Sequence, residues 1–124
     1  MTERQRTILV VDDDEDVLFT ARTYLEDQGY EVLQATNGAA GLELLKGDTK
    51  IDLLFTDIVM PGGMDGFELV RQAKQVRPKL RVLYTSGFFK EMPAVGREMH
   101  GELLPKPWRF SHLDEAVKRA FHYH

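Results

Sequence analysis

Four short apolar runs, each followed at once by a polar residue, constrain how this chain can fold more than any other feature of its sequence. The runs lie at residues 8–11, 51–56, 82–85 and 103–105. Apolar runs of this length, bounded by turn residues, are typical of buried strands. The residues that end them are the Asp12-Asp13-Asp14 cluster, Asp57, Ser86 and Lys106. We therefore predict that four strand ends bring carboxylates, a hydroxyl and an ammonium group to one edge of a sheet.

Segments with helical spacing of apolar residues separate these runs. They lie at 17–25, 39–45, 67–76 and 113–121, and a further strand is predicted at 30–35. Residues 88–101 are less helical because Pro93, Gly96 and Gly101 are costly inside a helix, so we predict a short or mobile fourth helix there. At the start of the last helix, Ser111 and Asp114 resemble a capping box.

Alternation of strand and helix from end to end predicts an α/β fold with a parallel sheet and helices on both faces. Among such folds, a flavodoxin-like, three-layer, doubly wound (βα)5 domain with strand order 2-1-3-4-5 is the usual solution at this size. This order places the first and third strands side by side, so Asp12, Asp13 and Asp57 should meet. We expect one domain over residues 1–124, with a core at about 7–122.

Composition excludes several classes of function. The net charge of −4 and the lack of a basic run argue against direct binding of nucleic acid. Cysteine is absent, so disulfides and thiol chemistry are excluded. Residues 1–6 lack the apolar stretch of a signal peptide, and no segment has the length of a membrane span. We expect a cytoplasmic domain.

The predicted cluster suits a divalent metal and a phosphoryl group. Three carboxylates in one cleft repel each other, and a hard cation such as Mg2+, which prefers oxygen ligands, removes that penalty. The Asp57 carboxylate can then act as a nucleophile toward phosphorus. The cation, Lys106 and the Ser86 hydroxyl would each stabilise one phosphoryl oxygen.

With these residues in place, the chain resembles the receiver domains of two-component response regulators. The resemblance rests on motifs that cover nearly the whole chain: residues 8–14, Asp57-Ile58-Val59-Met60-Pro61, residues 64–69, Thr85-Ser86-Gly87 and Leu104-Pro105-Lys106-Pro107-Trp108. It implies that Asp57 is the phosphoacceptor, that Asp13 binds Mg2+ (or Mn2+) directly, and that Asp12 does so mainly through water. It also implies that the Val59 carbonyl is a further ligand and that the Lys106–Pro107 peptide is cis. The donor would be a phosphohistidine on a sensor histidine kinase or a histidine phosphotransfer protein. The surface around the fourth helix, fifth strand and last helix would change on phosphorylation.

Three departures from the family pattern carry expectations of their own. Leu103 stands where many receivers have the aromatic residue that rotates on activation, which places that switch in doubt. The loop Pro61-Gly62-Gly63-Met64 has an additional glycine. Together with Ser86-Gly87-Phe88 and Leu104-Pro105-Lys106-Pro107-Trp108, this loop resembles receivers found in or beside hybrid histidine kinases. The residues expected to flank the path of a hydrolytic water are Val59 and Phe88, which are both apolar. We therefore expect slow self-dephosphorylation.

Two other classes of function compete with this interpretation. An aspartate-nucleophile phosphohydrolase would usually carry a second acid at the position of Val59. A flavin-binding electron carrier of the same fold would need a phosphate-binding loop after the first strand, where this chain is acidic. The sequence leaves open whether the chain is a free-standing regulator or part of a hybrid kinase. A monomer or a weak homodimer is expected.

Several conspicuous residues have simpler interpretations. Asp14 to Asp16 suit a solvated turn at a helix N-terminus. Trp108 and Phe110 are interpreted as packing residues. The four histidines lack the spacing of metal ligands and are interpreted as surface residues.

Overall fold

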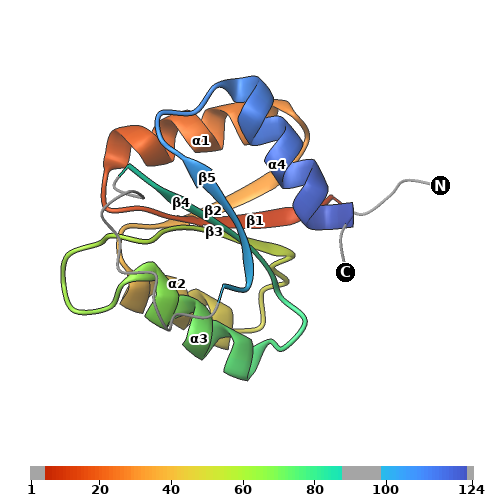
Figure 1. Cartoon of the computed structure of the whole chain (residues 1–124). Coiled ribbons are helices and arrows are strands. Elements are labelled where there is room, and N and C mark those ends of the chain that lie inside the picture. Colours follow the sequence, from red (N-terminus) through yellow and green to blue (C-terminus); the bar gives the residue numbers. More distant parts are fainter. Residues whose placement is uncertain (1–4, 88–98, 123–124) are drawn as a thin grey trace.

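Five parallel strands form one sheet in the computed structural model, which describes residues 5–87 and 99–122 (Figure 1). The strands are β1 (Thr7–Val11), β2 (Glu31–Ala35), β3 (Leu53–Asp57), β4 (Arg81–Ser86) and β5 (Gly101–Pro105). The helices described are α1 (Glu15–Asp27), α2 (Gly38–Lys46), α3 (Gly66–Val76) and α4 (Phe110–His122). The fourth helix predicted within residues 88–101 falls mainly on residues 88–98, outside the described residues. The last predicted helix is α4.

The strand order is β2-β1-β3-β4-β5, which confirms the predicted topology. In the register of the sheet, Val11 pairs with Thr56, and Asp57 pairs with Thr85. Because the strands are parallel, their carboxyl ends all reach the same edge. The residues that end the apolar runs therefore come together, as the sequence predicts.

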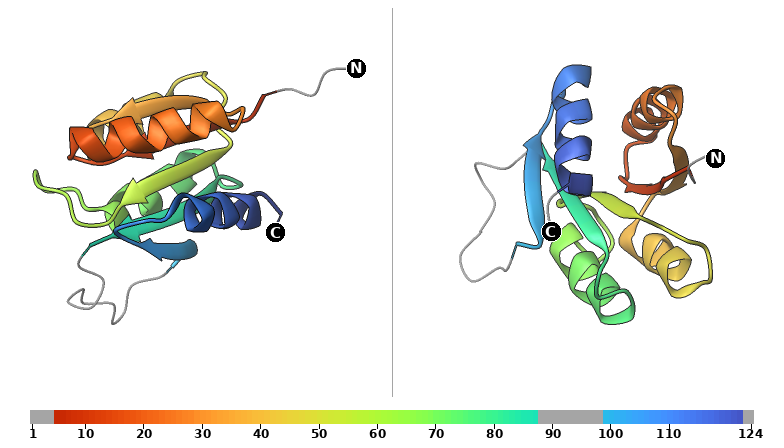
Figure 2. Two further views of the ribbon diagram at one scale, coloured as in Figure 1. Left: turned by 90° about the horizontal axis from the view of Figure 1, so that it is seen from above. Right: turned by 90° about the vertical axis from the view of Figure 1, so that its right-hand side faces the viewer.

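Helices cover both faces of the sheet. Helices α1 and α4 lie on one face and α2 and α3 on the other, and both views of the ribbon agree on this arrangement (Figures 1 and 2). Side chains alternate between two cores along each strand: Phe55 packs with the α1 and α4 cluster, whereas Leu54 packs with the α2 and α3 cluster. Every residue of β1 and β3 is buried. This burial on both faces explains why these strands are continuous apolar runs rather than alternating ones.

Side-chain caps begin three of the helices. The Asp14 carboxylate accepts the backbone N–H groups of Asp16 and Val17, as expected for an acidic turn at a helix N-terminus. Asn37 and Asp65 cap α2 and α3 in the same way. No helix among residues 5–87 and 99–122 is both long enough and apolar enough to cross a lipid bilayer.

The capping box predicted at Ser111 is wrong. Helix α4 begins one residue earlier, at Phe110, and the N–H of Leu113 donates to the carbonyl of Arg109. Ser111 therefore lies inside the first turn. The Asp114 carboxylate pairs instead with Lys118 one turn further on, at 2.9 Å, in the i,i+4 arrangement that favours ion pairs on helices.

Candidate functional site

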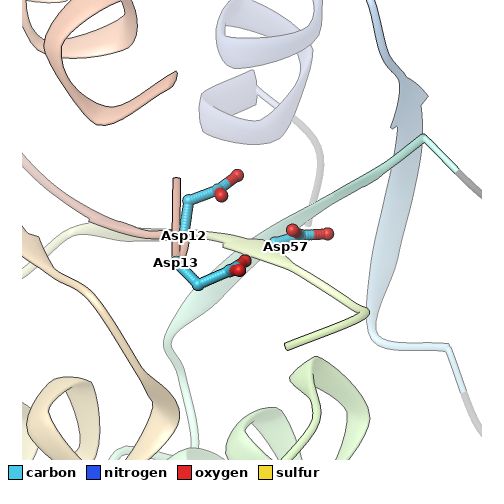
Figure 3. Close-up of side chains that lie close together, drawn as sticks. All are labelled: Asp12, Asp13 and Asp57. Carbon is cyan, nitrogen blue, oxygen red and sulfur yellow. The ribbon is translucent and has the colours of Figure 1, made fainter. Parts of the chain in front are cut away.

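Three carboxylates form the centre of the candidate site. Asp12 directly follows β1, and Asp57 is the last residue of the adjacent strand β3, so the topology brings both side chains to one point. Asp12, Asp13 and Asp57 each offer a carboxylate oxygen, and these oxygens lie within 4.8 Å of one another (Figure 3). Asp12 and Asp57 are buried, while Asp13 is exposed. The group predicted from the sequence is therefore assembled in the fold.

Lys106 reaches this cluster from the end of β5. Its Nζ lies 2.7 Å from Asp12 Oδ2 and 3.2 Å from Asp57 Oδ2. Its backbone N–H donates to the Ser86 carbonyl at 3.0 Å, and the Lys106–Pro107 peptide is cis, as predicted. One ammonium group thus forms ion pairs with two buried carboxylates. Because the cluster contains three carboxylates, it keeps an excess of negative charge.

The Asp57 carboxyl has a raised pKa. Burial and the neighbouring charge of Asp12 raise the pKa of the Asp57 carboxyl from 3.8 to about 6, against the opposing effects of Lys106 and of the Val59 N–H. A carboxyl with this pKa is mainly ionised at neutral pH, as a nucleophile must be. Burial alone lowers the pKa of Lys106, but its contacts with Asp12 and Asp57 outweigh that effect and raise it, so Lys106 is a cation.

A tightly packed loop holds the Asp57 carbonyl against the start of α3. The N–H of Gly66 donates to the Ile58 carbonyl at 2.8 Å, and a Cβ added to Gly66 would lie 2.3 Å from the Asp57 carbonyl oxygen. Glycine is therefore required at this position to let the helix approach the strand end. Within the loop, Gly62 and Gly63 have φ values of 96° and 94°, which glycine adopts readily. The Val59 side chain is 44% exposed beside Asp57.

Ser86 ends β4, and its neighbour Thr85 is a residue that sequence reasoning missed. Ser86 is fully buried at the strand end. The Thr85 hydroxyl donates to the Leu104 carbonyl at 2.6 Å and accepts the indole N–H of Trp108 at 2.8 Å. Trp108 also packs against Phe55 with ring centroids 5.3 Å apart, which agrees with its interpretation as a packing residue. The hydrogen bond to Thr85 had no signal in the sequence, because the two residues are far apart along the chain.

Leu103, the position that lacks the aromatic residue, is half-buried and packs against the α2 and α3 core. Its register partner on β4 is Tyr84, which is fully buried. The Tyr84 ring lies 5.6 Å from that of Phe67, and its hydroxyl accepts the N–H of His100 at 3.2 Å. An aromatic side chain thus lies beside Leu103 on the neighbouring strand. Phe88, the other predicted flanking position, falls outside the described residues.

A pocket of about 540 Å³ opens beside Lys106. It lies between α1 and the loop after β5, and its lining includes Val17, Thr20, Pro107 and Trp108. A larger hollow of about 680 Å³ lies near the other edge of the molecule, around Lys74 and Arg81. Of the two, only the pocket beside Lys106 is lined by a residue that contacts the carboxylate cluster.

Comparison with known proteins identifies related domains. The family model of the response regulator receiver domain matches residues 8–118. The response regulator receiver protein CpdR of Brucella abortus (strain 2308) is 34% identical over 116 residues, which cover 92% of this chain and 95% of that protein. Sensor kinase CckA of the same strain is 30% identical over 117 residues, which cover 90% of this chain and 12% of the kinase. The chain therefore spans nearly all of one relative and a small part of the other.

Solved structures agree with these relationships. The receiver domain of a hybrid histidine kinase CckA matches with a TM-score of 0.80 and 33% identity, over 94% of this chain and 99% of that one. A response regulator receiver protein from Sinorhizobium medicae WSM419 matches with a TM-score of 0.84 and 28% identity, over 95% of each chain.

Proposed function

The chain belongs to the response regulator receiver domain family of two-component signalling, and we propose that it accepts a phosphoryl group on Asp57 from a phosphohistidine. The observation that carries this proposal is the convergence of the Asp12, Asp13 and Asp57 carboxylates with the Lys106 ammonium at one sheet edge. A carboxylate nucleophile beside a fixed cation suits phosphoryl transfer, which depends mainly on positioning and charge stabilisation.

The carboxylate cluster fits Mg2+, with Mn2+ as a substitute. Its oxygens are close enough together to share one cation, and Lys106 alone leaves the three carboxylates incompletely neutralised. We assign Asp13 and Asp57 as direct ligands, Asp12 as a ligand mainly through water, and the Val59 carbonyl as a further ligand. When bound, the ion would neutralise charge on the carboxylates and on a phosphoryl oxygen.

In the transfer step, an Asp57 carboxylate oxygen attacks phosphorus in line with the phosphorus–nitrogen bond of the donor. A phosphorus–oxygen bond forms, and the electron pair of the broken bond returns to the imidazole nitrogen. Lys106 moves from Asp12 to a phosphoryl oxygen, and the Ser86 hydroxyl donates to another. Lys106 is suited to this role because its backbone is tied to Ser86 while its side chain reaches both carboxylates.

The donor is proposed to be a sensor histidine kinase or a histidine phosphotransfer protein in the cytoplasm. Asp13 is the exposed member of the cluster, and the pocket beside Lys106 adjoins the ammonium that contacts the two buried carboxylates. The proposed output is a change in the surface around residues 88–101, β5 and α4, with Ser86 moving toward the phosphoryl group. Because Leu103 is not aromatic, this response would not use a rotating ring at that position.

The lifetime of the phosphoryl group is proposed to be long. Val59 is exposed, its backbone N–H donates to Asp57 Oδ1, and its side chain has no polar group to orient a water molecule. Val59 also occupies the place where a phosphohydrolase would need a second acid. The N-terminus of α1 is capped by Asp14, which leaves no basis for a flavin phosphate there. The apolar residue at position 59 argues against a phosphohydrolase, and the acidic cap on α1 argues against a flavin carrier. Both therefore favour a signalling module.

The roles of Lys106 and Ser86 are tested by the rate of phosphoryl gain from acetyl phosphate with Mg2+. Lys106→Met should lower this rate by about 10²–10³-fold, the usual effect of removing one group that stabilises transition-state charge. Ser86→Ala should lower it by a smaller factor. Lys118→Met, which removes an exposed lysine on α4, is the matched control and should match the wild type. A Lys106→Met variant as fast as the wild type would contradict the proposal.

A further inference from the structure

Thr85 links the phosphoacceptor strand to the loop that carries Lys106. It is the register partner of Asp57, and its carbonyl accepts the N–H of Ile58, the residue after Asp57, at 2.9 Å. On the other side, its hydroxyl donates to the carbonyl of Leu104 at 2.6 Å. Thr85 is buried, so these hydrogen bonds are shielded from competing water.

The loop after β5 is attached to β4 by two hydrogen bonds, one from Lys106 itself and one from a residue just beyond it. The backbone N–H of Lys106 donates to the Ser86 carbonyl at 3.0 Å. The indole N–H of Trp108, two residues later, donates to the Thr85 hydroxyl at 2.8 Å. Both bonds end on consecutive residues of one strand. The backbone of Lys106 is therefore tied to β4 directly and, two residues later, through Trp108, while its side chain extends to Asp12 and Asp57.

We propose that Trp108 is a positioning residue that holds Lys106 in place relative to Asp57 by donating its indole N–H to the Thr85 hydroxyl. The contact with Phe55 accounts for the packing of the Trp108 ring. It does not need an indole N–H, so the hydrogen bond to Thr85 is a separate interaction with its own effect. The chain of contacts from Trp108 through Thr85 to Ile58 joins the cation to the nucleophile across the intervening strand. A displacement of about 1 Å at such a site lowers the rate of a reaction substantially.

Two variants separate the hydrogen bond from packing. Trp108→Phe keeps an aromatic ring against Phe55 and removes the indole donor. Thr85→Val keeps the approximate volume of the side chain and removes the hydroxyl, and with it both the bond from Trp108 and the bond to the Leu104 carbonyl. Phe110→Leu is the matched control, since Phe110 lies two residues beyond Trp108, is 49% exposed and stacks on Tyr24.

The first measurement is amide hydrogen exchange by NMR without metal or phosphodonor. Trp108→Phe should speed exchange at the Lys106 amide by about tenfold through local opening, and leave amides of central β1 and β3 unchanged. Thr85→Val should have at least this effect, and the double variant should exchange no faster than Thr85→Val. An unchanged exchange rate at the Lys106 amide of Trp108→Phe would overturn the inference. An equal increase in exchange rate at all amides would overturn it as well.

The second measurement, which rests on the proposed function, is the rate of phosphoryl gain from acetyl phosphate. Trp108→Phe should be slower by about tenfold, with Mg2+ affinity within about twofold of the wild type. The effect should vanish when Thr85→Val or Lys106→Met is already present, and Phe110→Leu should match the wild type. Full additivity with Lys106→Met would overturn the positioning role. If the wild type gains no phosphoryl group, the proposed function fails, and hydrogen exchange alone decides whether Trp108 holds Lys106.

Discussion

Replacing Asp57 with asparagine should stabilise the fold at neutral pH, because the ionised carboxylate is costly where it lies. Burial and the charge of Asp12 raise the pKa of Asp57 from 3.8 to about 6. Each tenfold change in acidity is worth about 1.4 kcal/mol, so ionised Asp57 lowers the free energy of unfolding by about 3 kcal/mol. Asparagine has nearly the same shape and carries no charge. Its single carbonyl oxygen can keep only one of the two bonds that the carboxylate accepts, from Lys106 at Oδ2 or from the Val59 N–H at Oδ1, so about 3 kcal/mol is the upper end of the expected gain.

The raised pKa of Asp57 also determines how the stabilisation by Asp57→Asn changes with pH. Between about pH 4 and pH 6 the folded wild type holds a proton at Asp57 that the unfolded chain has lost, so its stability falls as pH rises through this window. The variant lacks this titration. The stabilisation by Asp57→Asn should therefore approach about 3 kcal/mol near pH 7.5 and shrink below about 1 kcal/mol near pH 4.

Urea unfolding of wild type and Asp57→Asn in a metal chelator, followed by the fluorescence of Trp108 and by circular dichroism, provides the assay. Asp13→Asn is the matched control, because it removes a neighbouring carboxylate that is exposed rather than buried. Mg2+ should reduce the difference in the free energy of unfolding between the variant and the wild type, because the ion binds the folded wild type and stabilises it. An Asp57→Asn variant no more stable than the wild type near neutral pH would refute the reasoning.

Three further predictions concern packing, the α2–α3 connection and phosphoryl lifetime. Gly66→Ala should cost about 1–3 kcal/mol or more in urea unfolding because its Cβ would lie 2.3 Å from a carbonyl oxygen, whereas Gly87→Ala, with its nearest neighbour at 3.9 Å, should be tolerated. Arg77→Leu should cost about 1.5–3 kcal/mol in the same assay, since the guanidinium donates to three backbone carbonyls between residues 45 and 49. Val59→Asn combined with Phe88→Glu should speed loss of the phosphoryl group, followed by mass spectrometry; an unchanged decay rate would contradict the expectation of slow self-dephosphorylation.

The elements that carry the site were predictable because burial leaves a direct trace in sequence. Strands β1 and β3 are covered on both faces, so their sequences are nearly continuous apolar runs, and an aspartate stands at the carboxyl end of each run. Parallel strands then place Asp12 and Asp57 at one edge. The strand order itself came from the usual behaviour of such folds rather than from these residues.

Contacts between side chains distant in sequence were not predictable in the same way. The pairing of Trp108 with Thr85 depends on the path of the loop after β5, for which no periodic pattern exists. The failed capping box at Ser111 has a similar origin: the motif is local, and Asp114 had a competing partner in Lys118. Short motifs were thus reliable where burial supported them and less so at an exposed helix end.

The central claim is that Asp57 accepts a phosphoryl group with the help of a bound cation. Intact mass spectrometry after incubation with acetyl phosphate and Mg2+ tests it most directly, with wild type, Asp57→Asn and a chelator control. The account predicts the gain of a single phosphoryl group by the wild type, and no gain by the variant or in the presence of the chelator. No gain by the wild type, or an equal gain by Asp57→Asn, would contradict it.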